Sequence, residues 1–103
     1  MEFKNVTLIA KANIYFDGKV TSRTFFTAQG ERKTLGIFLP GDYEFATAAE
    51  ELMQILAGTV DILLPGEMEF HRFGADSQFT VAANSSFKLK VQTVTDYCCS
   101  FRD

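Results

Sequence analysis

The chain has 103 residues, a formal net charge of −3 and 47% hydrophobic residues. This length favours a single domain over residues 1–103, and the composition excludes intrinsic disorder, which requires low hydrophobicity and high net charge. The sequence contains no cluster of Lys and Arg that would attract nucleic acid, and none of its apolar runs approaches the roughly 20 residues needed to cross a bilayer. We therefore expect neither nucleic acid nor a membrane as a partner.

The first half of the chain reads as short runs of β-forming residues separated by turns. Residues 6–9 predict a first strand and residues 13–16 a second, which Asp17-Gly18 closes. Asp-Gly between two such runs is typical of a hairpin, since both central residues of a type I′ turn need positive φ. Further strands are predicted at 20–21, 23–28, 33–39 and 43–45, with turns at 29–31 and 40–42.

The middle of the chain allows two interpretations. Residues 47–52 either form a helical turn capped by Thr47 or lead into the strand at 53–56. Residues 87–91 alternate apolar and polar side chains, so one face of that strand is buried. The remaining strands are predicted at 59–64, 68–73, 78–81, 87–94 and 97–101. The sequence therefore predicts an all-β domain, either a small barrel or a jelly roll.

Two features bear on compartment and assembly. Cys98 and Cys99 are neighbours that point to opposite faces of a strand, which makes a disulfide framework implausible and favours a reducing, cytoplasmic compartment. We treat residues 1–12 as an N-terminal strand extension. Within it, residues 3–12 alternate apolar side chains and leave strand edges unpaired, which predicts a homodimer that buries them across a two-fold axis.

Four sequence blocks occur in the order found in one known family. The most specific reads PGDYEFAT at 40–47 and is followed by Glu51, Met53 and Gly58; the others are 15–20, 33–36 and 84–89, the last with Tyr97-Cys98-Cys99. On these blocks the sequence resembles the pyrimidine/purine nucleoside phosphorylases, a family of small single-domain cupins, and the resemblance covers roughly residues 13–101. The resemblance implies a cupin-type jelly-roll β-barrel.

The cupin pattern also locates the four positions where metal-binding cupins carry three His and one Glu. Here these positions hold Phe45, Thr47, Glu51 and Phe87, and the one histidine, His71, lies outside the motif. Rings and a hydroxyl group supply none of the imidazole nitrogens that such a centre needs. We therefore expect no metal and no cofactor, and we expect His71 to be a surface or structurally satisfied residue.

The chain departs from the family pattern at turn positions. Glu50 stands where a proline commonly precedes the acid, and Asp76 and Ala82 stand where glycine and proline are common. We expect altered loop geometry at these positions, with the chemistry retained.

The resemblance implies phosphorolysis, in which a nucleoside and inorganic phosphate give a free base and ribose 1-phosphate. Phosphate binding calls for Arg, Lys or backbone N–H donors. Arg32 and Lys33 together with the hydroxyl of Thr34 are the first candidates, and Lys19 beside the first hairpin turn is another. Lys33 is also a candidate catalytic residue. Each of these cations would otherwise be a solvated turn residue.

Further candidates follow from the cupin positions. Glu51 is a candidate catalytic residue that acts on the sugar hydroxyls or the base, unless it forms a structural ion pair. Phe45, Met53 and Phe87 are expected to line the cavity, either stacking on a base or forming plain core. Three further candidate binding residues are Thr47, which replaces a ligand His by a hydroxyl, and Tyr43 and Asn84, which have packing and turn roles as alternatives.

Three hypotheses on function stay open at this point. The leading one is a metal-independent pentosyltransferase, a nucleoside phosphorylase with broad base tolerance, because apolar walls discriminate weakly among bases. The second is a non-catalytic cupin that binds a small polar metabolite. The third is a structural dimeric β-protein whose polar interior is incidental.

Overall fold

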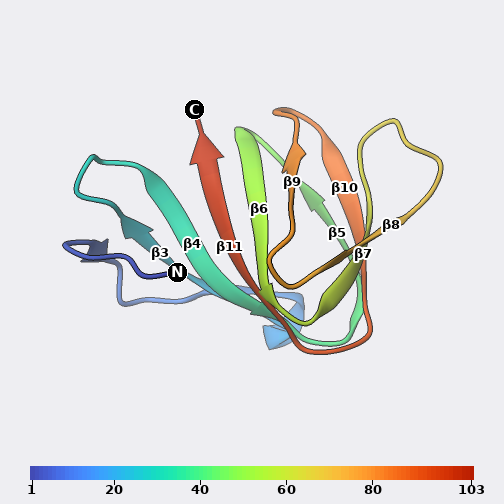
Figure 1. Cartoon of the computed structure of the whole chain (residues 1–103), viewed down its shortest axis with the longest axis horizontal. Coiled ribbons are helices and arrows are strands. Elements are labelled where there is room, and N and C mark those ends of the chain that lie inside the picture. Colours follow the sequence, from blue (N-terminus) through green and yellow to red (C-terminus); the bar gives the residue numbers. More distant parts are fainter.

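The computed structural model describes residues 1–103 as eleven strands and one 3₁₀ turn, η1 (Phe16–Gly18), in two antiparallel sheets (Figure 1). The larger sheet contains β1 (Thr7–Leu8), β2 (Asn13–Tyr15), β3 (Val20–Phe26), β4 (Arg32–Phe38), β6 (Glu50–Ala57), β9 (Gln78–Val81) and β11 (Thr95–Arg102). Its order is β1-β3-β4-β11-β6-β9, and β2 also pairs with β3. The smaller sheet contains β5 (Gly41–Ala46), β7 (Thr59–Leu63), β8 (His71–Gly74) and β10 (Ser86–Val91), in the order β5-β10-β7-β8.

The hydrophobic core lies between the two sheets. Along β10, Phe87, Leu89 and Val91 are buried while Lys88 and Lys90 are exposed, as the sequence alternation predicts. Fourteen buried residues, contributed by strands of both sheets, form one cluster. The all-β prediction is confirmed. No helix in the structure has the length and apolar character needed to cross a membrane.

The first hairpin forms as predicted, but with a different turn. β2 and β3 pair as far as Tyr15 opposite Val20, which leaves residues 16–19 as the loop. Phe16 and Asp17 both have left-handed backbones, with φ of 53° and 55°. The two-residue turn and the placement of Phe16 in the strand are therefore wrong. The left-handed backbone turns the Phe16 ring onto β5, a tertiary contact that a local pattern does not contain.

The helical interpretation of residues 47–52 is wrong. Residues 50–57 form β6, which pairs with β11 on one side and with β9 on the other, so that sheet pairing overrides local helix propensity. Thr47 precedes this strand. Its side-chain oxygen donates to the carbonyl of Ala82 at 2.7 Å and accepts the backbone N–H of Ser85 at 3.0 Å. Thr47 thus anchors the loop that leads into β10.

Several predicted strand bounds are also corrected. The first strand is reduced to Thr7–Leu8, and the strand expected at 68–73 begins only at His71. The strand expected at 87–94 ends at Val91. Pairing with a neighbouring strand decides these ends, and β1 and β8 each pair on one side only.

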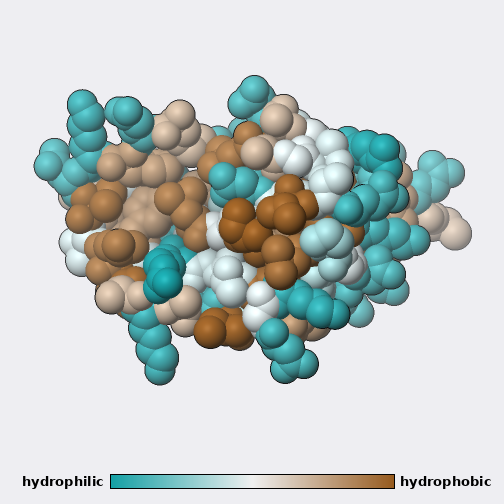
Figure 2. All heavy atoms as spheres, turned by 90° about the horizontal axis from the view of Figure 1, so that it is seen from below, coloured by the Kyte–Doolittle hydropathy of each residue, from teal (hydrophilic) through white to brown (hydrophobic).

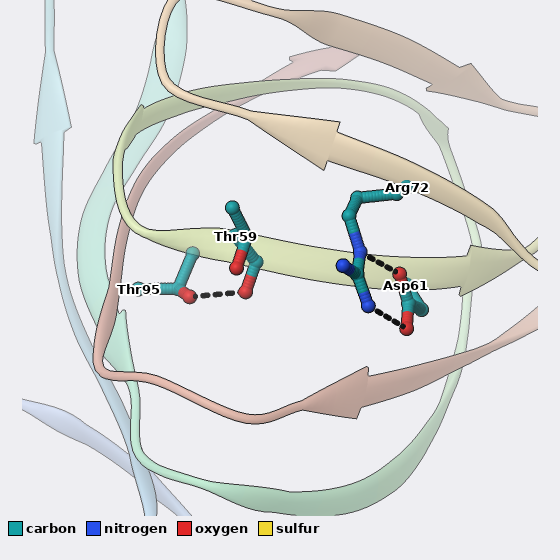
Figure 3. Close-up of polar contacts among 4 residues, drawn as sticks. All are labelled: Thr59, Asp61, Arg72 and Thr95. Atoms are coloured by element: carbon teal, nitrogen blue, oxygen red, sulfur yellow. Dashed lines mark hydrogen bonds and ion pairs between the residues drawn. The ribbon is translucent and has the colours of Figure 1, made fainter.

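Two polar contacts tie β7 to its surroundings (Figure 3). Arg72 on β8 donates two hydrogen bonds to Asp61 on β7, at 2.8 and 3.1 Å. This hydrogen-bonded guanidinium lowers the pKa of Asp61, so the stabilisation is present at neutral pH and is lost on acidification. The buried hydroxyl of Thr95 donates to the carbonyl of Thr59 at 3.0 Å and ties the start of β11 to β7.

Candidate active site

A cavity of about 270 Å³ opens between the sheets, near the lower end of the size range of small-molecule sites. Most of its wall comes from β4, β6 and β11 of the larger sheet and from β5 and β10 of the smaller one. The lining residues are Tyr15, Ser22, Arg32, Thr34, Phe38, Phe45, Ala46, Glu51, Met53, Phe87, Tyr97, Cys99 and Phe101.

Strand register arranges the larger sheet's contribution in rows. In the first row, Phe101 stands opposite Glu51, and the Cζ atom of Arg32 lies 3.9 Å from the centroid of the Phe101 ring. In the second row, Thr34 and Met53 stand on either side of Cys99. The charged groups therefore lie at one end of the cavity, followed by a hydroxyl and a thiol.

Arg32 is the cation of the first row. Its side chain is 41% exposed, and its one ion pair is long, with 3.9 Å between Nη2 and Oδ1 of Asp103. The planar guanidinium therefore retains donors for an anion that enters the cavity.

Glu51 is the acid of the same row. Burial raises the pKa of its carboxyl group, while a hydrogen bond from Cys99 and the charge of Arg32 act in the opposite direction. The Cys99 Sγ donates to Glu51 Oε1 at 3.6 Å. Burial, together with the neighbouring Glu51, raises the pKa of the Cys99 thiol, so this thiol stays protonated at neutral pH and acts as a donor.

Aromatic rings form the rest of the wall. The rings of Phe38 and Tyr97 stack with centroids 4.0 Å apart and planes at 9°. Phe45 and Phe87 of the smaller sheet lie 6.2 Å apart at 29°, and Tyr15 meets Phe45 edge-on at 5.6 Å. Burial raises the pKa of Tyr97, so its hydroxyl stays neutral. The result is a cavity with a largely aromatic wall and charged groups at one end.

Gly36 makes room for the Tyr97 ring. The two residues are register partners on β4 and β11. A Cβ atom at Gly36 would clash with the backbone carbonyl oxygen of Thr21 and would lie 2.7 Å from Cζ and from the hydroxyl oxygen of Tyr97, closer than atoms pack. Only glycine at this position lets the ring lie flat across β4 and stack on Phe38.

The structure brings six of the predicted site residues to the cavity. They are Arg32, Thr34, Phe45, Glu51, Met53 and Phe87. The cupin positions located Phe45, Glu51 and Phe87, and Met53 came from the first family block. The turn-flanking position of Arg32 and Thr34 pointed to the other two.

The other five predicted site residues do not line the cavity. Lys33 lies on the opposite face of β4, where its Nζ donates to Ser100 Oγ at 2.7 Å. Tyr43 is buried, and its hydroxyl donates to the carbonyl of Leu39 at 2.6 Å. The last three are Thr47, which holds the loop described above, Lys19, which is exposed, and Asn84, which is exposed with a left-handed φ of 54°.

Seven lining residues were not singled out from the sequence. They are Tyr15, Ser22, Phe38, Ala46, Tyr97, Cys99 and Phe101. Strand alternation places Tyr97, Cys99 and Phe101 on one face of a strand, and Phe38 on the same face as Thr34. The sequence pattern therefore indicated which residues lie together. What was missing was the knowledge of which face of each strand is turned inward.

The residues present do not suit the metal centre of the cupin fold. No group of three or more His, Cys, Asp and Glu side chains lies close enough together to hold an ion. His71 is exposed, and its Nε2 lies 3.7 Å from Glu67 Oε1, remote from the four cupin positions.

Comparison with known sequences places the chain in a family. The sequence profile of the pyrimidine/purine nucleoside phosphorylases matches residues 10–101. The chain belongs to this family. A pyrimidine/purine nucleoside phosphorylase from Hydrogenovibrio crunogenus is 55% identical over 102 residues, which cover 99% of this chain and 98% of that protein. Its counterpart from Chlorobium chlorochromatii is 59% identical over 100 residues, covering 97% and 96%.

Solved structures confirm the cupin-type fold expected for the family. A protein of unknown function from an Acinetobacter species superimposes with a TM-score of 0.95 at 36% identity, covering 98% of each chain. An RmlC-like cupin from Shewanella frigidimarina gives a TM-score of 0.69 at 13% identity, covering 95% of this chain and 84% of that one. The second likeness concerns the fold alone.

Proposed function

We propose that this member of the family is a metal-independent nucleoside phosphorylase that converts a pyrimidine or purine nucleoside and inorganic phosphate into the free base and ribose 1-phosphate. One observation carries the proposal: a guanidinium and a carboxyl group share one end of a cavity, and most of the other lining residues are aromatic. The four cupin positions hold Phe45, Thr47, Glu51 and Phe87, so substrate groups take the place of a metal.

The proposed substrate orientation follows the polarity of the cavity. Phosphate binds to the guanidinium of Arg32 and the hydroxyl of Thr34 by charge-assisted and neutral hydrogen bonds. The ribose lies beside Glu51, whose carboxylate accepts hydrogen bonds from the sugar hydroxyls. The base packs against the aromatic wall that Phe38, Tyr97 and Phe45 form.

The reaction then needs one bond to form and one to break. A phosphate oxygen bonds to C1′ of the ribose, and the C1′–N bond breaks with its electron pair passing to the base. The base takes up the proton that hydrogen phosphate gives up. Positive charge that develops on the sugar is stabilised by the carboxylate of Glu51, as a carboxylate does in glycoside hydrolysis. This assigns Glu51 to work in its ionised form.

Broad base specificity is part of the proposal. Strong discrimination requires buried donors and acceptors matched to one base edge. Six aromatic residues line the cavity, and the hydroxyls of Ser22, Tyr15 and Tyr97 on its wall can rotate to donate or accept. Such walls hold any flat heterocycle of suitable size.

We also propose a homodimer, assembled through the outer face of the N-terminal half. Nine of the eleven large exposed apolar residues lie within residues 1–39. A groove of about 540 Å³ runs over β3 and β4, and its walls include Leu8, Ile14, Leu35 and Ile37. Seen from below, the molecule gathers its most hydrophobic residues at the left and centre, whereas hydrophilic residues cover most of the right (Figure 2).

A second copy is the occupant that suits this groove. The groove's one charged residue, Arg23, already donates to the carbonyl of Ala10, and the edges of β1 and β2 have no partner strand beyond β3. Antiparallel pairing of such an edge with its own copy is compatible with two-fold symmetry. The two neighbouring free thiols, Cys98 and Cys99, favour the cytoplasm as the compartment in which the enzyme acts.

The direct test is release of free base from uridine and from inosine, with and without inorganic phosphate. We expect release from both nucleosides only when phosphate is present, with ribose 1-phosphate as the second product. Nucleoside binding without turnover would replace the proposal by a non-catalytic cupin. Neither binding nor turnover would leave a structural β-protein.

A further inference from the structure

Glu51 has one direct polar partner in the structure, the thiol of Cys99. Cys99 on β11 stands diagonally to Glu51 on β6, and its Sγ donates to Oε1 at 3.6 Å. Both side chains line the cavity. We propose that Cys99 is a positioning residue: its thiol hydrogen bond holds the Glu51 carboxylate ionised and turned toward the sugar. This inference rests on the proposed function and assigns a role to a residue that it does not use.

The need for such a partner comes from the surroundings of Glu51. The cation that faces it is Arg32 on β4, and Tyr97 on β11 is neutral. β9 places the apolar Val81 opposite Glu51, and the smaller sheet contributes only the rings of Phe45 and Phe87 and Ala46 to this cavity. Because the carboxyl group is partly buried among apolar atoms, its charged form needs donors.

The extent to which Arg32 stabilises the negative charge of Glu51 depends on whether phosphate is bound. Once phosphate binds to the guanidinium, the positive charge is shared with an anion, and its effect on Glu51 weakens. The thiol is a neutral donor, so it has no charge that bound phosphate could neutralise. Since the pKa of Cys99 is raised, the thiol keeps its proton across the neutral range and continues to donate.

Cys98 provides a matched control one residue away. It is fully buried, but it lies on the opposite face of β11, where it pairs with Leu35 and Gln54 rather than facing the cavity. Removing its sulfur therefore imposes a similar packing change on the same strand while leaving the contact with Glu51 intact.

The experiment compares Cys99→Ala, Cys99→Ser and Cys98→Ala in the full chain, with folding of each checked by thermal melting. The Glu51 side chain is titrated by carbon NMR on glutamate-labelled protein, with Glu51→Gln identifying its signal. In parallel, kcat/KM for uridine at saturating phosphate is measured against pH.

We expect Cys99→Ala to move the Glu51 titration and the acidic limb of the pH profile upward together. An upward shift of half a unit lowers kcat/KM about threefold on the acid side of the limb and leaves the alkaline plateau almost unchanged. Cys99→Ser, which retains a donor, should lie between the alanine variant and the wild type. Cys98→Ala should follow the wild type in both measurements.

An unmoved Glu51 titration in Cys99→Ala would overturn the inference, as would an equal shift in Cys98→Ala or a uniform loss of rate at all pH values. A second outcome separates the two proposals. If the wild-type protein shows no phosphorolysis but the Glu51 titration still shifts in Cys99→Ala alone, the proposed function is wrong, while the effect of the Cys99 hydrogen bond on Glu51 is confirmed.

Discussion

The two faces of the larger sheet carry similar residues with different surroundings. The inner face turns a cation, an acid and a thiol into the cavity, while the outer face carries the same three types one residue away. The inner set is Arg32, Glu51 and Cys99, and the outer set is Lys33, Glu50 and Cys98. Sheet geometry causes the contrast, since neighbouring side chains on a strand point to opposite faces. Chemical identity alone therefore does not make a site.

The partners of each set show what the difference does. On the outer face, Lys33 donates to Ser100, and Glu50 accepts from Arg102 at 3.3 Å. On the inner face, Arg32 retains donors for an anion and Glu51 is held by a thiol. The outer groups have their partners within the fold, whereas the inner groups remain available to a substrate. Each inner residue thus has a built-in control beside it.

The largest expected effect is at Glu51. Glu51→Gln keeps the shape but removes the charge that stabilises the sugar, and we expect kcat/KM for uridine to fall about a hundredfold or more. Glu50→Gln on the same strand should stay within about threefold of the wild type, because it breaks only an exposed ion pair. Steady-state phosphorolysis assays measure both. Equal losses in the two variants would erase the distinction between the faces.

Assembly through the outer face is tested at Ile14. Ile14→Lys places an unpaired charge in the apolar groove of each copy, and we expect the dimer dissociation constant to rise about a hundredfold. Sedimentation velocity over a concentration series follows the change. Val94→Lys, at another exposed apolar residue away from the groove, should leave the dimer intact. A wild-type chain that sediments at its monomer mass of 11.5 kDa at micromolar concentration would contradict the dimer.

Substitutions at Arg32 and Lys33 test which of these two cations binds phosphate. Arg32→Ala should raise the KM for phosphate about tenfold, the effect of losing one charge-assisted hydrogen bond. Lys33→Ala should change this KM less, because its Nζ faces the opposite side of β4. Initial rates at varied phosphate and fixed nucleoside separate the two. A larger effect at Lys33 would relocate the phosphate site to the outer face.

The smallest expected effect is on stability. The pKa of Glu51 is raised in the folded chain, so its contribution to stability is fully present below the pKa of the unfolded chain and is lost as the pH rises through the folded pKa. Glu51→Gln should therefore stabilise the fold at pH 7, by less than about 1 kcal/mol because solvent screens this partly exposed group. Urea unfolding at pH 7 and pH 4 checks this: the gain should shrink at pH 4, where the wild-type carboxyl is protonated.

Local sequence patterns were sufficient for the class of fold and for part of the cavity. The alternation through 87–91 gave a strand with one buried face, and Asp17-Gly18 marked a hairpin. Family resemblance, which goes beyond any local pattern, led to Phe45, Glu51 and Phe87 through the cupin positions and to Met53 through the first family block. The local features succeed because side-chain period and turn chemistry are properties of a few consecutive residues.

Only the tertiary structure decided which face of each strand is turned toward the cavity. Alternation puts Arg32 and Lys33 on opposite faces of β4, but only pairing of β4 and β6 with β11, far along the chain, selects Arg32 for the cavity. The same pairing brings Cys99 to Glu51, two residues separated by 48 positions. Which residues of a strand share a face follows from the local sequence. Which of the two faces is buried depends on how strands distant in the sequence pack around one core.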